Sequence, residues 1–495
     1  MFDTATNIEI YKAAVKSLGK DLKNNFYEFF NYYWPAIDDA ELIDNWHIKY
    51  VCDELQMVAE GVFVNKPRKY DLAINIPPGT TKSNICSVLF PVWCWVNKTS
   101  LRFIVSSFSS SLASDFAIKS RDVIQSEDFR LMYPDIGLRI DRNQIMKYEN
   151  NYKGVRYSVG FNGTITGKHA DIILIDDPLK AEDAFSRTKR IHANRIITHT
   201  LSRRKRDNKV TLTVLIMQRL HEDDPTSEFL KRTKVKHICL PGVLTDNVKP
   251  EEVKNNYVNG LLDPQRLDEE SLAEIKNEMG TFGYASQILQ NPVDDETAIF
   301  NPQWWQRYHS LPVMTNIIQV WDTAFEKGET NDYSVCATWG LDVNGFYLMN
   351  IYRDKITFPD LVAKSKSQFE LYKPSIVIIE QKASGHSLIQ QLRHETRIPI
   401  RAYDPQDKDK VVRAHEVSPR IESGHVFLPV DSYWLDEYLA EHHSFPHGTR
   451  DDQVDTTSMA LKYLMPIFDK MHSGRVKTFS VSANKQSKNI DFTGY

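Results

Sequence analysis

The chain has 495 residues, a net charge of −4, 25% charged residues and 41% hydrophobic residues, the composition of an ordinary globular protein. At about 150 residues per domain, this length predicts two or three domains. The balanced charge excludes a uniformly basic nucleic-acid coat, although a local basic surface could still contact DNA. Five cysteines without CxxC spacing argue against a disulfide scaffold or a zinc site.

The N-terminal residues lack the charged and then apolar pattern of a secretion signal. The longest apolar run, residues 88–96, is too short to span a bilayer and contains Pro91. We therefore expect a cytosolic protein without a membrane segment.

The first half of the sequence predicts helices followed by a parallel sheet. Residues 1–70 read as helical, and the segment WHIKYVCDELQMV has apolar residues at helical spacing. From residue 71 the apolar runs LAINI, RFIVSS, DIILI, VTLTVLIM and VKHICL predict buried strands, with helices expected around 83–96, 111–125 and 186–202. Alternating helices and continuously apolar strands indicate an α/β domain with a doubly wound, mainly parallel sheet.

The second half follows a different order. Residues 245–300 are polar and interrupted by Pro and Gly, which favours a subdomain and linker. Three strands are predicted next, in IIQVWDTA, YSVCATWGL and FYLMNIYRD, the last two joined by an Asn-Gly hairpin signal. The strands SIVIIE, IRAYD and HVFLP then alternate with helices expected at 359–372, 387–396 and 410–423, before a last helix in DDQVDTTSMALKYL. This order is typical of an RNase H-like mixed sheet.

A candidate nucleotide site lies where the segment INIPPGTTKS leaves a strand and opens a helix. In a phosphate loop the backbone amides surround the phosphates, a Lys reaches the terminal phosphates and a hydroxyl binds Mg²⁺, and Lys82 and Ser83 suit these roles. The match is loose because Thr81 stands where glycine is usual. The strand IILIDD ends in Asp176, which could hold Mg²⁺, and Asp177, which could polarise the attacking water.

Phosphoryl transfer also needs a cation near the developing negative charge. Arg121 and Arg219 are the candidates, although each could be an ordinary surface or salt-bridging arginine. Gln218 ends its strand and could sense the terminal phosphate, or could simply be a polar strand end.

A second constellation consists of acids in the last third of the chain. Asp322 follows IIQVW, Glu380 follows SIVII, and Asp451, Asp452 and Asp455 begin the last helix. Each acid alone could be a strand end or a helix first turn. Together, two strand ends and one helix face would bring several carboxylates close to one another. Divalent ions would relieve the repulsion between them, and such an arrangement suits two-metal phosphodiester hydrolysis. Asp332 could assist from an adjacent strand.

The run LSRRKRDNK at 201–209 is strongly basic. It could contact DNA phosphates, but a charge run is more often a solvated face.

Eight motifs occur in an order that resembles the large terminase family of tailed bacteriophages, over roughly residues 40–465. They are WHIKYVCDELQMV, INIPPGTTKS, TGKHADIILIDDP, VLIMQRLHEDD, YASQILQNPV, VWDTAF with NDYSV, VIIEQKASG and FPHGTRDDQVDTTSMALKYL. The resemblance implies an N-terminal P-loop ATPase of the additional-strand, conserved-glutamate type at 1–245 and a linker at 246–310. It further implies an RNase H-like nuclease at 311–468, with a flexible tail at 469–495.

The activity that this resemblance implies is a DNA-packaging motor. Such a protein hydrolyses ATP to move double-stranded viral DNA into a procapsid and cuts concatemeric DNA. It would need ATP and Mg²⁺ in the first domain and two Mg²⁺ or Mn²⁺ ions in the second. The expected partners are the portal protein, the small terminase subunit and further copies in a ring, usually a pentamer. The protein would act in the host cytoplasm, docked transiently on the procapsid, and would be absent from the mature virion.

The resemblance also assigns residues to each site. The residues expected to bind ATP are Pro78, Gly79, Thr80, Thr81, Lys82, Ser83, Asp176 and Gln218. The expected metal ligands are Ser83, Asp176, Asp322, Glu380, Asp451, Asp452 and Asp455. The expected catalytic residues are Asp177, Arg121, Asp322, Glu380 and Asp452. Asp177 stands where many relatives carry Glu, and the phosphate loop lacks their Arg, so Arg121 is expected to act on a neighbouring subunit's site.

Two other classes of protein remain as alternatives. A helicase or recombination ATPase would have a purely structural C-terminal domain, so its acids could be replaced without loss of activity. A non-catalytic scaffold with a decayed phosphate loop would show no ATP turnover.

Overall fold

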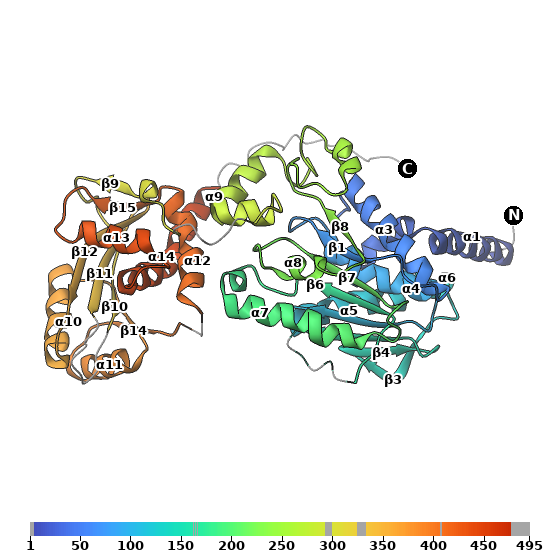
Figure 1. Cartoon of the computed structure of the whole chain (residues 1–495), viewed down its shortest axis with the longest axis horizontal. Coiled ribbons are helices and arrows are strands. Elements are labelled where there is room, and N and C mark those ends of the chain that lie inside the picture. The colour runs from blue at the N-terminus through green and yellow to red at the C-terminus, as the bar shows by residue number, and fades with distance from the viewer. Residues whose placement is uncertain are drawn as a thin grey trace, which may run out of the picture. The chain divides into compact units, whose positions relative to one another are not determined.

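A computed structural model describes residues 4–161, 163, 165, 167–292, 299–323, 333–405 and 408–476. The chain divides into two compact units, Met1–Asp295 and Glu296–Tyr495 (Figure 1). The division falls within the stretch 246–310 that the sequence predicts to be a linker. Asp332 and residues 477–495 of the predicted tail lie outside the described residues.

The first unit is built on an eight-stranded sheet in the order β3-β4-β5-β2-β6-β7-β1-β8. Its strands from β5 to β8 in that order pair in parallel, whereas β3 and β4 form an antiparallel hairpin at one edge. The strands are β1 (Asp71–Asn75), β2 (Arg102–Ser107), β3 (Leu138–Gln144), β4 (Lys147–Asn150), β5 (Val155–Gly160), β6 (Ile172–Asp176), β7 (Leu212–Met217) and β8 (Val235–Cys239).

Helices cover both faces of this sheet. Because successive side chains of a strand point to opposite faces, Leu72 and Ile74 pack with α3, α4 and α5, whereas Ala73 packs with α7 and α8. The helices up to the hairpin are α1 (Thr4–Asn24), α2 (Phe26–Tyr33), η1 (Trp34–Ala36), α3 (Trp46–Phe63), η2 (Asn84–Leu89), α4 (Phe90–Asn97), α5 (Ser110–Gln125) and α6 (Glu127–Met132). Those after it are η3 (Glu182–Phe185), α7 (Arg187–Arg195), η4 (Ile196–Leu201), η5 (Ser202–Arg204), α8 (Pro225–Leu230), η6 (Glu251–Asn256) and α9 (Glu269–Gln287).

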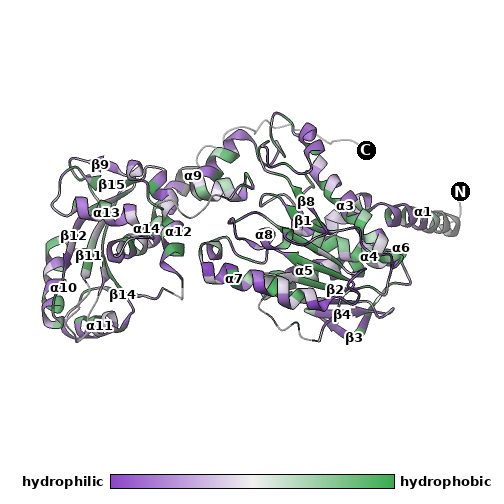
Figure 2. Cartoon of the chain, in the orientation of Figure 1, coloured by the Kyte–Doolittle hydropathy of each residue, from purple (hydrophilic) through white to green (hydrophobic). Residues whose placement is uncertain are grey.

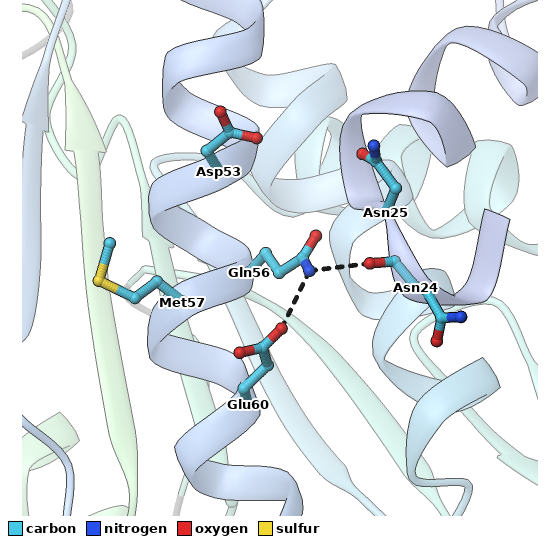
Figure 3. Close-up of a pocket in the computed structure, with 6 residues that line it drawn as sticks. All are labelled: Asn24, Asn25, Asp53, Gln56, Met57 and Glu60. Atoms are coloured by element: carbon cyan, nitrogen blue, oxygen red, sulfur yellow. Dashed lines mark hydrogen bonds between the residues drawn. The ribbon is translucent and has the colours of Figure 1, made fainter. Parts of the chain in front are cut away.

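A polar pocket lies beside α3, at the junction between α1 and α2. Figure 3 shows Gln56 of α3 donating to the carbonyl of Asn24 and to Glu60 Oε1, both at 2.9 Å. Gln56 Oε1 also accepts from the backbone amide of Phe26 at 2.9 Å. One glutamine therefore satisfies backbone groups that the break between the two helices leaves without partners, which gives the pocket a structural role.

The second unit has a seven-stranded mixed sheet in the order β14-β13-β10-β11-β12-β15-β9. The antiparallel meander β10-β11-β12 is extended by β13 and β14 on one side and by β15 and β9 on the other, all in parallel pairs. The strands are β9 (Gln306–Tyr308), β10 (Asn316–Asp322), β11 (Ser334–Leu341), β12 (Phe346–Asp354), β13 (Ile376–Glu380), β14 (Ile400–Tyr403) and β15 (Val426–Pro429).

Two layers of helices enclose this second sheet. Ile318 and Val320 of β10 pack with α12, α13 and α14, whereas Trp321 packs with α10 and α11 on the other face. The helices are η7 (Pro302–Trp304), α10 (Phe358–Tyr372), α11 (Ala383–Glu395), α12 (Lys410–Glu422), α13 (Leu435–Ser444) and α14 (Asp452–Val476). In the hydropathy view (Figure 2) green concentrates on the central strands, whereas the helices carry both colours, as burial of apolar strands requires.

The predicted fold class, a mainly parallel α/β unit followed by an RNase H-like mixed sheet, is confirmed. Three details differ from the sequence prediction. The polar stretch 245–300 contains the helix α9, the hairpin β3-β4 was not predicted, and α14 continues to Val476, past the predicted start of the tail at 469. None of the helices among the described residues combines the length and the apolar character needed to cross a bilayer.

Candidate active sites

The order of the first sheet brings the nucleotide-site residues to one edge. The phosphate loop follows β1, Gln218 follows β7, and Asp176 ends β6. Because β7 lies between β1 and β6 in parallel register, the ends of these three strands lie side by side. Gln218 therefore stands between the lysine of the loop and the two acids.

The backbone of the phosphate loop has left-handed conformations at two positions. Gly79 and Thr81 both have positive φ angles, 76° and 69°. Glycine adopts this region freely, but a β-branched residue is strained there by roughly 1–3 kcal/mol. The loop thus keeps the conformation that a glycine usually supplies at position 81, although this chain carries threonine.

Two further contacts hold the loop in place. Thr80 Oγ1 donates to the carbonyl of Pro77 at 2.7 Å, and the carbonyl of Thr80 accepts from Nε2 of His47 at 3.2 Å. Nδ1 of His47 accepts from the side chain of Asn45 at 2.9 Å. Burial lowers the pKa of His47 to about 4, so a neutral histidine fastens α3 to the loop.

Asp176 is fully buried and accepts hydrogen bonds on both carboxylate oxygens. Ser83 Oγ donates to Oδ1 at 3.0 Å and Ser87 Oγ donates to Oδ2 at 2.6 Å. Burial, together with the neighbouring charge of Asp177, raises the pKa of Asp176 to about 7. Such a carboxylate is costly to ionise in isolation and is stabilised by a bound cation.

Asp177 adopts a positive φ of 41° and turns its carboxylate toward Lys82, with 3.7 Å between Oδ2 and Nζ. Its Oδ1 atom is buried and has no hydrogen-bond partner among the described residues. Burial raises the pKa of Asp177, while Lys82 acts in the opposite direction. A buried acceptor without a partner beside the phosphate loop fits a carboxylate that orients a water molecule. Ser83, Asp176 and this free oxygen together fit a magnesium–nucleotide complex.

Lys82 completes the first site. Its Nζ donates to Oε1 of Gln218 at 2.8 Å, so the lysine connects the loop with the end of β7. The structure therefore brings together Lys82, Ser83, Asp176, Asp177 and Gln218.

The two candidate arginines lie elsewhere. The helix α5 follows the C-terminal end of β2, which lies beside Asp176, and runs back along the sheet. Arg121 occupies the C-terminal part of α5. Its charge acts on Tyr148 of β4, not on the loop. Arg219 is bound by Asp224, with Nε 2.8 Å from Oδ2. The role of Arg121 on a neighbouring subunit stays a prediction.

The second site is formed by the ends of two parallel neighbours. Asp322 ends β10 and Glu380 ends β13, and the register pairs the preceding residues Trp321 and Ile379. Burial and the charge of Glu380 raise the pKa of Asp322 well above its usual range. The tight approach of α11 requires Gly385, because a Cβ there would lie 1.9 Å from the carbonyl oxygen of Glu380.

Asp455 of α14 joins this pair through a buried arginine. Arg413 of α12 contacts Glu380 Oε1 at 3.2 Å and Asp455 Oδ1 at 2.8 Å, and its side chain is 3% exposed. Lys382 contacts Glu380 Oε2 at 2.6 Å, and Lys410 contacts Asp455 Oδ2 at 2.8 Å. Burial alone would raise the pKa of Glu380, but Lys382, the hydrogen bond with Asp322 and Arg413 outweigh it and lower the pKa.

The other two acids at the start of α14, Asp451 just before the helix and Asp452 as its first residue, face different partners. Asp451 is held by Lys410 at 2.6 Å, at the rim of the same group. Asp452 instead lies near Arg353 and Glu441, and burial with the charges of Glu441 and Asp451 raises its pKa to about 6. The structure therefore brings Asp322, Glu380 and Asp455 together and turns Asp452 away from them. Its assignment as a metal ligand and catalytic residue stays a prediction.

Whether the second site can bind a metal ion depends on the ion pairs that Arg413, Lys382 and Lys410 make with its carboxylates. Within the described residues, no three His, Cys, Asp or Glu side chains are arranged as a metal-binding group. Asp322 and Glu380 form a two-carboxylate donor set that suits one divalent ion. Asp455 can join them only if its ion pairs with Arg413 and Lys410 give way to metal contacts.

Several residues of both sites were not found from the sequence. Ser87 lies four residues after Ser83 in η2, and both hydroxyls donate to Asp176. His47 and Lys382 lie within the motifs WHIKYVCDELQMV and VIIEQKASG but were not assigned to a site, whereas Lys410 and Arg413 lie outside the motifs. The KVVR segment at 410–413 offered a weak signal, because both its cations lie on one face of a helix.

Comparison with known proteins agrees with this geometry. Residues 319–464 match the family model described as the terminase RNase H-like domain. No curated protein sequence matches the chain.

Solved structures of large terminases resemble this chain over most of its length. The large terminase of a thermophilic bacteriophage aligns with a TM-score of 0.54 and 13% identity, over 82% of this chain and 98% of that chain. The same terminase in complex with ATP-γ-S aligns with a TM-score of 0.51 and 13% identity, over 81% and 96%. The large terminase nuclease of the thermophilic phage G20c with bound magnesium gives a TM-score of 0.26 and 19% identity, over 34% and 98%.

The first of these structures shows the fold, and the family model adds the family of the second unit. Together they support the large terminase subunit that the sequence motifs predict.

Proposed function

We propose that this chain is the ATP-driven motor and nuclease that packages the DNA of a tailed virus. The observation that carries the proposal is the connected set of Lys82, Gln218, Asp177, Asp176 and Ser83 at one sheet edge, in a chain whose second unit matches the terminase RNase H-like family model. A phosphate loop without hydrolysis would not need Asp177 held in a strained conformation beside the lysine.

In this proposal each residue of the first site has one task. The backbone amides of Gly79 to Ser83 and the Nζ of Lys82 hold the nucleotide phosphates. Ser83 and Asp176 would hold Mg²⁺, which supplies positive charge to the phosphate oxygens. Asp177 orients the attacking water through its unpaired Oδ1 atom. Gln218 exchanges its contact with Lys82 for one with the terminal phosphate and so reports the nucleotide state to β7.

The second site would cleave the DNA backbone. Asp322 and Glu380 would hold one Mg²⁺ or Mn²⁺ ion, and Asp455 would help to hold a second one after metal contacts replace its ion pairs with Arg413 and Lys410. The two ions would together activate water and stabilise the leaving oxygen. Until then Arg413 pairs with both Glu380 and Asp455, and Lys382 and Lys410 each pair with one of these carboxylates. The proposed partners are double-stranded DNA, the portal protein, the small terminase subunit and further copies in a ring on a procapsid in the host cytoplasm.

The experiment measures two activities in the same samples of the full chain. ATP turnover is followed with and without duplex DNA, and plasmid cleavage is followed with Mg²⁺ or Mn²⁺. Lys82→Ala should lower ATP turnover by about 10²–10³-fold and leave cleavage unchanged, whereas Asp322→Asn should do the reverse. The exposed residues Lys20 and Asp436 provide the matched controls Lys20→Ala and Asp436→Asn.

The outcomes separate the alternatives. ATP turnover without cleavage, unaffected by Asp322→Asn, would favour a helicase-like ATPase with a structural second unit. Cleavage without any ATP turnover would favour a scaffold with a decayed phosphate loop. Loss of both activities in either variant would contradict two separate sites.

A further inference from the structure

The segment from α7 to η5 concentrates positive charge in a chain that is slightly acidic overall. Residues 187–206 contain eight Lys and Arg residues and no Asp or Glu, whereas the whole chain has 61 basic and 65 acidic residues. The segment follows the Asp176-Asp177 strand end and covers one face of the first sheet (Figure 1). Its charge is therefore a local property of one layer of the first unit.

The inner side of this segment is firmly anchored. Ala193, Ile197 and Leu201 are buried in the core beneath the sheet face. The guanidinium of Arg190, 7% exposed, donates to the carbonyl of Ala184 at 2.6 Å, and the Asn194 side chain donates to the carbonyl of Asp223 at 2.9 Å. The outer side chains are consequently presented by a fixed helix and not by a loop.

The outer side carries cations that the protein itself does not neutralise. Lys189, Lys205 and Arg206 form ion pairs with Asp183, Asp71 and Asp171. Arg187, Arg195 and Arg203 are exposed, and none of the three has an ion-pair partner among the described residues. From Arg187 to Arg203 the helical path spans roughly 24 Å at about 1.5 Å per residue.

Among the described residues, the unpaired arginines on this face and its lack of an apolar centre favour a polyanion as the binding partner. Ile191 is the large apolar side chain exposed between 187 and 206, whereas a protein interface would have an apolar or aromatic centre. Arginine binds phosphate oxygens in a bidentate manner and loses less entropy per bond than lysine. Duplex DNA carries about one negative charge per 1.7 Å of axis, so the three arginines can each meet a phosphate along one stretch of backbone.

We infer that the outer face of α7 to η5, formed by Arg187, Arg195 and Arg203, binds the phosphate backbone of duplex DNA. The inference rests on the proposed function, because it names the surface through which the ATPase unit holds its DNA. The contact is independent of base sequence, as translocation along any DNA requires. Because its inner side is buried against the sheet, this arginine surface belongs to the helical layer that follows Asp177 in the chain.

The test uses the full chain with the double substitution Arg195→Gln and Arg203→Gln. Binding of a short fluorescent duplex is measured by anisotropy over a series of salt concentrations, without nucleotide or divalent ions. Losing two phosphate contacts should reduce the slope of log K against log salt by about 1.8, or about 0.9 for each contact. The matched control is Lys16→Gln with Lys20→Gln, two exposed cations of α1 with the same loss of charge.

Basal ATP turnover without DNA should be unchanged in the double variant, which shows that it is folded, while stimulation by DNA should fall. An unchanged salt slope, or an equal loss in the α1 control, would overturn the inference and leave the motor intact. If the wild-type chain binds no duplex at all, the proposed function fails and the inference fails with it.

Discussion

The two sites of this molecule differ in how many cations face their buried carboxylates. In the first, one lysine faces two adjacent acids, and burial raises the pKa of Asp176 to about 7. In the second, Lys382, Lys410 and Arg413 surround the acids, and the pKa of Glu380 is lowered, although burial still raises the pKa of Asp322. In the first site burial dominates the protonation of the carboxylate, whereas in the second the neighbouring cations partly offset the effect of burial.

The largest expected effect comes from removing the buried cation of the second site. Arg413→Leu leaves Glu380 and Asp455 without their shared partner, and breaking a buried pair in this way costs roughly 3–5 kcal/mol. Hydrogen exchange of the β10 and β13 amides should show this loss of protection in metal-free buffer, while β1 and β6 stay protected.

Arg420→Leu is the matched control, because Arg420 also lies on α12 but pairs with the half-exposed Asp469. Equal protection of β10 in the Arg413 and Arg420 variants would show that Arg413 is not the group that neutralises the site. Added Mn²⁺ should restore part of the protection in Arg413→Leu, since another cation then faces the same carboxylates.

The second prediction concerns pH and the first site. Because the pKa of Asp176 in the folded protein, about 7, is above its usual value, the folded state keeps a proton that the unfolded chain releases. The corresponding stability is present below about pH 4 and is lost as the pH rises to 7, by up to about 1.4 kcal/mol per unit. Asp176→Asn should therefore be more stable than wild type at pH 8 in EDTA, with the difference shrinking toward pH 4.

Urea-dependent hydrogen exchange of the β6 amides at several pH values measures this difference. Asp53→Asn serves as the control, because that carboxylate is half-exposed and pairs with Lys49 on the surface. A difference between wild type and Asp176→Asn that grows toward low pH would have the wrong sign and would contradict the raised pKa.

The sequence predicts the parts of each site that are local in the chain. Lys82 with Ser83, and Asp176 with Asp177, each follow one apolar strand, so their positions at a sheet edge follow from the strand pattern alone. Asp322 and Glu380 follow from the same rule. The parallel sheet and the mixed sheet could be predicted because most of their strands are buried and apolar.

What the sequence could not predict depends on packing. Asp451, Asp452 and Asp455 lie close together in sequence, and the packing of α14 against α12 decides that Asp455, not Asp452, pairs with Arg413, the partner of Glu380. The role predicted for Arg121, on a neighbouring subunit's site, depends on an assembly of copies and stays a prediction. The hairpin β3-β4 escaped prediction because its strand LRIDRNQ is largely exposed and polar.

The smallest expected effect tests whether the three cations of the second site act as a unit. Lys382 contacts Glu380 at 2.6 Å, but its side chain is 46% exposed, and solvent screens an ion pair of this kind. Lys382→Ala should therefore cost less than about 1 kcal/mol in the free energy of unfolding, because Arg413 still pairs with Glu380. A loss as large as that of Arg413→Leu, measured by the same exchange of β10 and β13 amides, would mean that the cations stabilise the carboxylates only together. The contrast between the sites would then be one of cooperativity and not of the number of cations.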